Sequence, residues 1–323
     1  MQSRTLPHTE LTVSRAAFGT MPLGTQADEA TARRMFDLCM DRGINFFDTA
    51  NSYNGGAAET ITGNILKGRR DRVVLASKVG RKMGDAPDDD GLSPAAMRKG
   101  LDQTLRRLQT DYLDLYYLHV PDWNTPIGES LATMDEFVRA GKVRYPACSN
   151  YAGWQVVQMI AVSEARGYQP PYVSQPMYNV LARGIEQEYF AMCKAYGVAA
   201  IVYNPLAGGL LTGKQHRERP IAGTRFDNNP LYLNRYWHPG YFDAVDELQA
   251  IAQRAGRSLI DLSLNWIQHH TPVDCVILGA SRMDQLEQNL DAFEKGGPLP
   301  ADVVHAIDQV WNNLRGITPN YNR

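Results

Sequence analysis

Residues 43–53 read Gly-Ile-Asn-Phe-Phe-Asp-Thr-Ala-Asn-Ser-Tyr, and the first half of this stretch has the apolar and aromatic character of a buried strand. The run ends at Asp48, whose ionised carboxylate is costly to bury unless a positive group lies beside it. The next apolar run ends at Lys78, and the run after that ends at His119. Because the carboxyl ends of parallel strands lie at one edge, we expect these three side chains to converge, together with Tyr53.

Short apolar runs alternate with segments of helical spacing along the whole chain. We expect strands at about 15–18, 43–48, 72–77, 113–118, 143–148, 172–174, 198–202 and 275–278. We expect helices at about 28–42, 57–67, 93–108, 126–140, 153–166, 185–196, 241–255, 259–270 and 283–293. Eight strands that alternate with helices are typical of an α/β fold with an eight-stranded parallel (β/α) barrel, the TIM barrel. We therefore predict one barrel domain over residues 1–323, with a long loop after the seventh strand and extra C-terminal helices.

Composition and charge exclude several classes of protein. The 323 residues carry 33 Lys and Arg against 35 Asp and Glu, so no basic surplus indicates binding to nucleic acid or to an anionic membrane. The amino terminus lacks the apolar core of a signal peptide and no run reaches the length of a membrane span, which predicts a cytoplasmic protein. The four separated cysteines predict free thiols, and the acidic residues 88–90 predict a solvated loop and no metal site.

The four converging side chains suit the protonation of an alkoxide. A tyrosine releases its proton reluctantly at neutral pH, since its pKa is near 10, and a lysine ammonium nearby would stabilise the anion. Asp48 would hold Lys78 charged and in place, while His119 would donate a hydrogen bond to a carbonyl oxygen. Tyr53 would then be the proton donor. No residue here supplies electrons, so the hydride must come from a cofactor.

Taken singly, each of these residues also has an ordinary structural explanation, such as a turn cap for Asp48 or a buried core histidine for His119. A glycine-rich segment further along the chain resembles a nucleotide-binding motif. Residues 208–215 nearly match the phosphate-binding pattern G-x-x-x-x-G-K-[ST], but Gln215 replaces the hydroxyl that would hold magnesium. A nucleotide triphosphatase is therefore disfavoured, and the lack of G-x-G-x-x-G disfavours a Rossmann dehydrogenase. A glycine-rich loop that carries Lys214 remains suited to the pyrophosphate of a dinucleotide.

A set of motifs follows the expected strands in a recognisable order: Phe47-Asp48-Thr49-Ala50-x-x-Tyr53, Lys78, Tyr117-Leu118-His119 and Ser149-Asn150. In this order the chain resembles the aldo-keto reductase superfamily over nearly its whole length. It is most similar to the aflatoxin-aldehyde and succinic-semialdehyde reductases. That similarity rests on His119-x-Pro121-Asp122, Ser149-Asn150-Tyr151-Ala152-x-Trp154, Met177-Tyr178-Asn179, residues 204–214, Asn234-Arg235-Tyr236-Trp237, residues 285–290 and the terminal Pro319-Asn320-Tyr321-Asn322-Arg323.

The resemblance implies NADPH-dependent reduction of aldehydes, and in a wider case ketones, with the four residues in the roles above. It implies that the cofactor NADP(H) is held by Ser149, Asn150, Gln175, Tyr203, Asn204, Leu206, Gly208, Lys214, Arg225, Gly279, Ser281, Arg282, Gln285, Gln288 and Asn289. A basic residue at 282 would favour NADP over NAD by pairing with the 2′-phosphate. Arg235 and Arg323 would grip a substrate carboxylate beside His119, so the favoured substrates would be small acidic or aromatic aldehydes.

The chain departs from the reductase pattern at two places, and the first of them bears on the substrate. Asn51-Ser52 stands where those reductases carry larger apolar residues, and Cys148 stands where glycine is usual. A sugar or aryl-alcohol oxidoreductase of the same superfamily is therefore an alternative. An alternative of another class is a cofactor-binding regulatory subunit like the potassium-channel beta subunits. The resemblance also suggests a homodimer.

Overall fold

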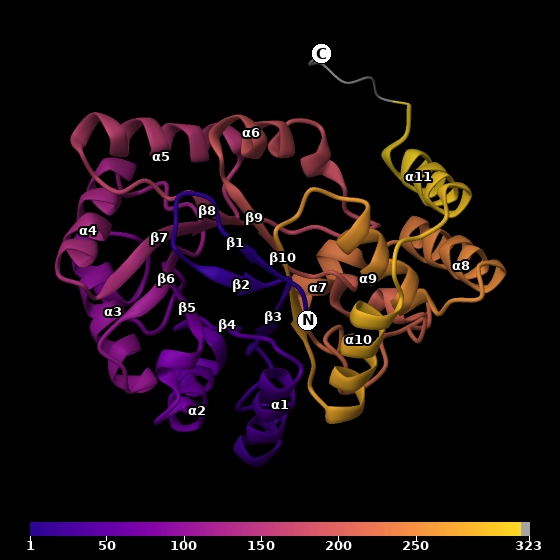
Figure 1. Ribbon diagram of the computed structural model, residues 1–323, viewed down its shortest axis with the longest axis horizontal. Coiled ribbons are helices and arrows are strands. Elements are labelled where there is room, and N and C mark those ends of the chain that lie inside the picture. Colours follow the sequence, from indigo (N-terminus) through magenta and orange to yellow (C-terminus); the bar gives the residue numbers. More distant parts are fainter. Residues whose placement is uncertain (318–323) are drawn as a thin grey trace.

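Eight parallel strands close into a barrel in the computed structural model, which describes residues 1–317 (Figure 1). The strands are β3 (Ala16–Gly19), β4 (Phe46–Asp48), β5 (Val74–Val79), β6 (Leu113–Leu118), β7 (Val143–Ser149), β8 (Val173–Gln175), β9 (Ala199–Val202) and β10 (Cys275–Gly279). Each strand pairs with the next, and β10 closes the ring by pairing in parallel with β3. The predicted TIM barrel is confirmed.

Helices surround the barrel (Figure 1). They are α1 (Glu29–Asp41), α2 (Ala57–Leu66), α3 (Pro94–Leu108), α4 (Ile127–Arg139), α5 (Gly153–Arg166), α6 (Tyr189–Tyr196), α7 (Pro230–Tyr236), α8 (Pro239–Arg254), α9 (Leu259–His269), α10 (Met283–Lys295) and α11 (Ala301–Arg315). Capping residues set their starts: the Asp28 carboxylate accepts from the Thr31 N–H at 2.8 Å, and the Ser93 hydroxyl accepts from the Ala96 N–H at 3.2 Å. No helix within residues 1–317 is both long and apolar enough to cross a bilayer.

A hairpin and a helix lie where the sequence indicated only a lead-in and a loop. Strands β1 (Ser3–Thr5) and β2 (Thr12–Ser14) form an antiparallel hairpin, and α7 lies within the long segment after β9. Leu6, Leu11 and Val13 of the hairpin segment are buried with the side chains that fill the barrel interior. The Ser14 N–H donates to the Asn45 side chain just before β4, so the hairpin covers the amino end of the barrel.

The four cysteines are buried free thiols, as predicted. In the acidic loop, Asp88 and Asp89 both pair with Lys99, at 2.7 and 2.8 Å. Within residues 1–317 no cluster of three or more His, Cys, Asp or Glu side chains could hold a metal ion.

A buried polar network fixes α2 and α3 behind β5. The Ser77 hydroxyl donates to Glu59 Oε1 at 2.5 Å, and Arg107 Nε donates to Glu59 Oε2 at 2.7 Å. Gly63 lets the two helices approach, because a Cβ there would lie 2.5 Å from the Arg107 carbonyl oxygen and 2.7 Å from the Leu108 carbonyl carbon. The residue before Lys78 is therefore anchored from outside the barrel.

Replacing Gly63 with alanine should destabilise the protein. The clash with backbone atoms outweighs the helix preference of alanine, and we expect a net loss of roughly 1–2 kcal/mol in the free energy of unfolding. Urea denaturation measures this loss. Gly184→Ala is the matched control, since nothing lies within 4 Å of a Cβ at that position. Equal stability of the two variants would contradict the close packing of α2 on α3.

Candidate active site

Several of the expected site residues lie at the carboxyl ends of barrel strands, in positions where the side chain points into the barrel. Inward-facing side chains fill the barrel, and the residue two positions later on each strand points the same way at the carboxyl rim. These interior side chains are Ala17, Phe46, Ala76, Tyr117, Ala147, Val173, Ile201 and Ile277. Two positions beyond them stand Gly19, Asp48, Lys78, His119, Ser149, Gln175, Tyr203 and Gly279. The strand period of two therefore carries every strand-end residue of the expected site to the same rim.

Lys78 and Asp48 form an ion pair inside this rim. The Lys78 ammonium donates to Asp48 Oδ1, and the two side chains are 0% and 3% exposed. The same ammonium donates to the Thr49 carbonyl oxygen at 2.7 Å, while Gln175 Nε2 donates to Asp48 Oδ2 at 2.9 Å. Opposite charge and further hydrogen bonds are what a buried pair needs in order to be tolerated.

Tyr53 and His119 complete the cluster. Tyr53 opens the 3₁₀ turn Tyr53–Gly56 that follows β4, and Lys78 Nζ lies 5.2 Å from the centre of its ring. The His119 ring meets the Tyr53 ring edge-on, with 6.0 Å between the centroids. The structure thus brings together the four side chains that the sequence analysis singled out.

Burial and the ion pair set the proton affinities of the cluster. Burial raises the pKa of Tyr53 above its usual value, and the Lys78 charge together with a hydrogen bond from Lys78 opposes this rise. Burial would lower the pKa of Lys78, but Asp48 and Tyr53 outweigh it and the pKa is raised. Burial, Lys78 and Arg81 hold the pKa of His119 well below its usual range. The lysine is therefore charged at neutral pH, and the imidazole is neutral with one N–H to donate.

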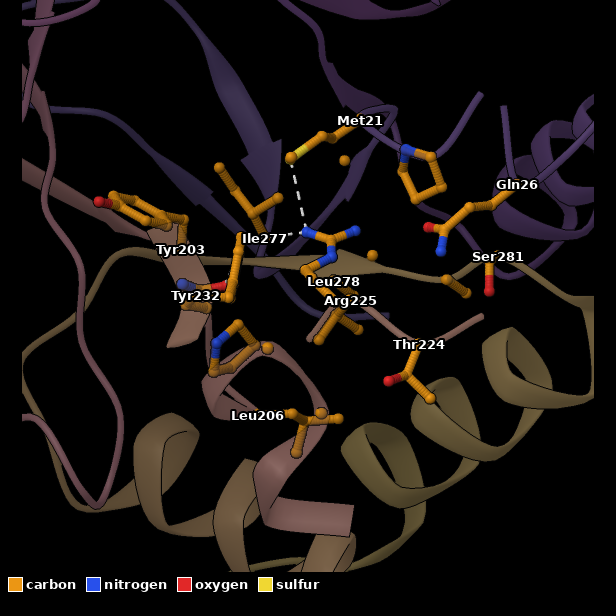
Figure 2. A pocket seen from close by; sticks show the side chains of 18 of the residues that line it. Met21, Gln26, Tyr203, Leu206, Thr224, Arg225, Tyr232, Ile277, Leu278 and Ser281 are labelled. Carbon is orange, nitrogen blue, oxygen red and sulfur yellow. Dashed lines mark hydrogen bonds between the residues drawn. The ribbon is translucent and has the colours of Figure 1, made fainter. Parts of the chain in front are cut away.

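A pocket of about 840 Å³ opens at the rim and runs from the cluster toward α10. Asp48, Tyr53 and His119 line it, whereas Lys78 lies behind them. All the residues expected to hold the cofactor line it as well: Ser149, Asn150, Gln175, Tyr203, Asn204, Leu206, Gly208, Lys214, Arg225, Gly279, Ser281, Arg282, Gln285, Gln288 and Asn289. Figure 2 shows Arg225 extending across the pocket toward Met21 on the other wall.

The pocket is strongly positive although the chain carries a net charge of -2. Its basic lining residues are Arg81, Lys82, Lys214, Arg225, Arg235 and Arg282. Among residues 1–317, the acidic residue that lines it is Asp48, which is already paired with Lys78. Such a surplus of positive charge favours an anionic ligand.

Near the cluster, the amides and hydroxyls of the rim are linked to one another. The Tyr203 hydroxyl donates to Asn150 Oδ1 at 2.6 Å, and Asn150 Nδ2 donates to the His119 carbonyl oxygen at 2.8 Å. Ser149 Oγ donates to the Gln175 carbonyl oxygen at 2.9 Å. The Gln175 amide nitrogen donates to Asp48, so Gln175 also ties β8 to the ion pair. These bonds fix the Tyr203 ring and the Asn150 amide at the pocket wall.

At the far end of the pocket, the residues before α10 are engaged with their own neighbours. The Ser281 N–H and hydroxyl both donate to Gln285 Oε1, each at 3.1 Å. Arg282 makes a bidentate pair with Asp284, at 3.0 and 2.9 Å, and its side chain is 58% exposed. The guanidinium expected to meet a 2′-phosphate therefore has an internal carboxylate partner.

Of the two arginines expected to bind substrate, the structure describes only Arg235. Arg235, on α7, lines the pocket with its guanidinium 6.0 Å from the Tyr203 ring centre. Arg323 lies outside the residues that the structure describes. Arg81 and Tyr232 line the pocket but were not predicted from the sequence. The Tyr232 hydroxyl accepts from Arg225 at 3.2 Å. The dipeptide Asn229-Pro230, a cap followed by proline at the first helical position, is the signal that could have revealed α7 and hence Tyr232.

Comparison with known proteins agrees with this geometry. The sequence model of the Aldo/keto reductase family matches residues 15–312. The chain is 36% identical to human aflatoxin B1 aldehyde reductase member 2, over 95% of this chain and 89% of that protein. It is also 36% identical to human aldo-keto reductase family 7 member A3, over 94% of this chain and 96% of that protein.

Another relative is named as a channel subunit and not as a reductase. The chain is 32% identical to the probable voltage-gated potassium channel subunit beta of rice, Oryza sativa subsp. japonica, over 99% of this chain and all of that protein. The family match nevertheless covers the whole barrel, including the strands that carry the buried cluster. The chain therefore belongs to the aldo/keto reductase family and is an oxidoreductase.

Proposed function

We propose that the protein reduces aldehydes to alcohols with NADPH and that Tyr53 is the general acid. The observation that carries this proposal is the Tyr53 phenol beside the Lys78 ammonium and the neutral His119 ring, at the wall of a positive pocket. When bound, the cofactor supplies a hydride to the carbonyl carbon. The Tyr53 hydroxyl gives its proton to the carbonyl oxygen, so that C=O becomes CH–OH.

The other three residues act on this proton transfer. The Lys78 charge stabilises the phenolate that Tyr53 becomes, because it lowers the free energy of an anion more than that of the neutral phenol. Asp48 keeps the ammonium protonated in its buried position. His119, neutral at working pH, donates its N–H to the carbonyl oxygen and so orients the substrate without competing as an acid.

Three features of the pocket fit a dinucleotide phosphate. Lys214 and Arg225 line the part of the pocket where the pyrophosphate would lie. Gly208 adopts a φ of 69°, which lets the backbone of this loop turn at the pocket wall. The Nδ2 atom of Asn204 is buried without a hydrogen-bond partner among the described residues, so it is a donor without an acceptor. These residues support NADP(H) as the cofactor.

The substrate end of the pocket supports small acidic or aromatic aldehydes. Aromatic rings of Tyr53, Tyr203 and Tyr232 line this region, and Arg235 adds a positive charge above Tyr203. An aromatic aldehyde could pack on the rings, and a carboxylate could pair with Arg235. The matching role of Arg323, the single-domain assignment and the homodimer remain predictions.

A binding role without turnover is the second candidate, and the rice relative named as a potassium channel subunit favours it. The two functions differ in one measurement. A panel of 2-carboxybenzaldehyde, succinic semialdehyde, methylglyoxal and an aldose, followed by the absorbance of NADPH, should show oxidation of NADPH. Tight NADPH binding with no turnover of any carbonyl would favour the binding role and would contradict the proposed reduction.

Tyr53→Phe should abolish reduction while leaving the cofactor in place. Removing a positioned general acid lowers kcat by about 10²–10⁴-fold, since no other group at the rim can donate the proton. Steady-state kinetics measure kcat, and fluorescence titration with NADPH measures binding. Tyr196→Phe, at an exposed position of α6, is the control and should keep the wild-type kcat. A Tyr53→Phe variant with more than half the wild-type kcat would show that the proton comes from elsewhere.

Arg282→Gln should weaken NADPH binding about tenfold more than NADH binding, because only NADPH carries the 2′-phosphate that this guanidinium would meet. Fluorescence titration with each cofactor measures both dissociation constants. Asp284→Asn should act in the opposite direction, since it frees Arg282 from its internal partner. Arg217→Gln is the control, because Arg217 is also exposed and paired with carboxylates but lies outside the pocket lining. Equal losses for NADPH and NADH in Arg282→Gln would exclude this contact.

A further inference from the structure

Arg81 occupies a place in the site that the sequence analysis did not recognise. It follows β5 by two residues, and Gly80 between them turns the chain with a φ of 115°. Val79 pairs with Leu118 across β5 and β6, and the His119 N–H donates to the Val79 carbonyl oxygen at 2.8 Å. The strand register therefore sets Arg81 on the rim beside His119, where it lines the same pocket as Tyr53.

Most other charged side chains of this loop have a partner, and among the described residues Asp90 accepts only from the neighbouring Gly91 N–H, at 2.8 Å. Lys82 pairs with Asp85 at 2.8 Å. Asp88 and Asp89 pair with Lys99. Within residues 1–317 Arg81 makes no hydrogen bond and no ion pair, and its side chain is exposed. Its guanidinium thus brings five N–H donors to the pocket with no protein acceptor for any of them.

Arg235 provides a second positive charge from the opposite side of the site. Its guanidinium lies 6.0 Å from the Tyr203 ring, on a helix that the long loop supplies. Arg81 lines the same pocket as Tyr203, and the charges of Arg235 and Arg81 both oppose the rise that burial causes in the pKa of Tyr203. Two positive charges therefore flank the region between Tyr53, His119 and Tyr203.

The cofactor does not account for a positive charge at this end of the pocket. The family resemblance assigns the phosphates and adenosine side of a dinucleotide to Lys214, Arg225 and Arg282, which also line the pocket. The nicotinamide ring is neutral when reduced and positive when oxidised, so it offers Arg81 no negative partner. A substrate that carries an anionic group would offer one.

We propose that Arg81 determines specificity by binding the carboxylate of a carboxylate-bearing aldehyde whose carbonyl faces Tyr53 and His119. This inference rests on the proposed reduction and names a contact for its substrate. The planar fork of a guanidinium matches the two oxygens of a carboxylate. Arg81 follows by two residues a barrel strand that is paired on both sides, whereas Arg235 lies on α7 in the long segment after β9.

The test compares an acid with its ester. 4-Carboxybenzaldehyde and methyl 4-formylbenzoate have nearly the same size, and only the first carries a charge. Arg81→Gln should raise KM for the acid by about tenfold to a hundredfold and leave KM for the ester and kcat for both nearly unchanged. Arg81→Lys keeps the charge without the fork and should recover part of the loss. Arg34→Gln, an exposed arginine of α1 outside the pocket, is the control and should match the wild type.

Binding of the product acid gives a readout that does not depend on turnover. Calorimetric titration with 4-(hydroxymethyl)benzoate should show a similar loss of affinity in Arg81→Gln. Equal KM changes for acid and ester, or unchanged product binding, would overturn the role of Arg81 while the proposed reduction stands. A wild-type protein that reduces neither aldehyde would overturn the reduction and, with it, this contact.

Discussion

The ion pair of Lys78 and Asp48 is the interaction on which the site depends. Two charges inside a barrel are tolerated only when each meets the other and the remaining polar atoms are satisfied. Here Thr49 and Gln175 supply those further bonds, so the pair links β4, β5 and β8 at the rim. Outside the barrel, Glu59 and Arg107 hold the residue before Lys78. The charge that acts on Tyr53 therefore has a fixed position before any ligand arrives.

The fixed charge of Lys78 affects Tyr53 and His119 in different ways. It opposes the effect of burial on the Tyr53 phenol, and it adds, with Arg81, to the burial that lowers the pKa of His119. One group is thus suited to give a proton and its neighbour to donate a hydrogen bond without giving up its own. The positive pocket extends from these groups to α10 in a chain of net charge -2, so the proposed anionic cofactor and the proposed anionic substrate would both be favoured by the same distribution of charge.

Much of the fold and the convergence of the four side chains could be predicted, because both follow from the strand period of two. Asp48, Lys78 and His119 each end an apolar run, and parallel strands bring their carboxyl ends together. The hairpin β1–β2 was missed since its few apolar residues have no periodicity until the barrel interior supplies their partners. The pairing of Arg282 with Asp284, and the lack of a partner for Arg81 in the described part of the chain, depend on side-chain directions in loops, which no sequence pattern specifies.

The pH dependence of kcat reports the effect of the ion pair on the Tyr53 phenol. The double variant Asp48→Asn/Lys78→Met removes both charges and leaves neither one buried alone. Because Lys78 lowers the pKa of Tyr53 more than Asp48 raises it, the pKa should be higher in the double variant. We expect a lower plateau of kcat and a fall at alkaline pH that begins at a higher pH than in the wild type. Superimposable profiles would contradict the account.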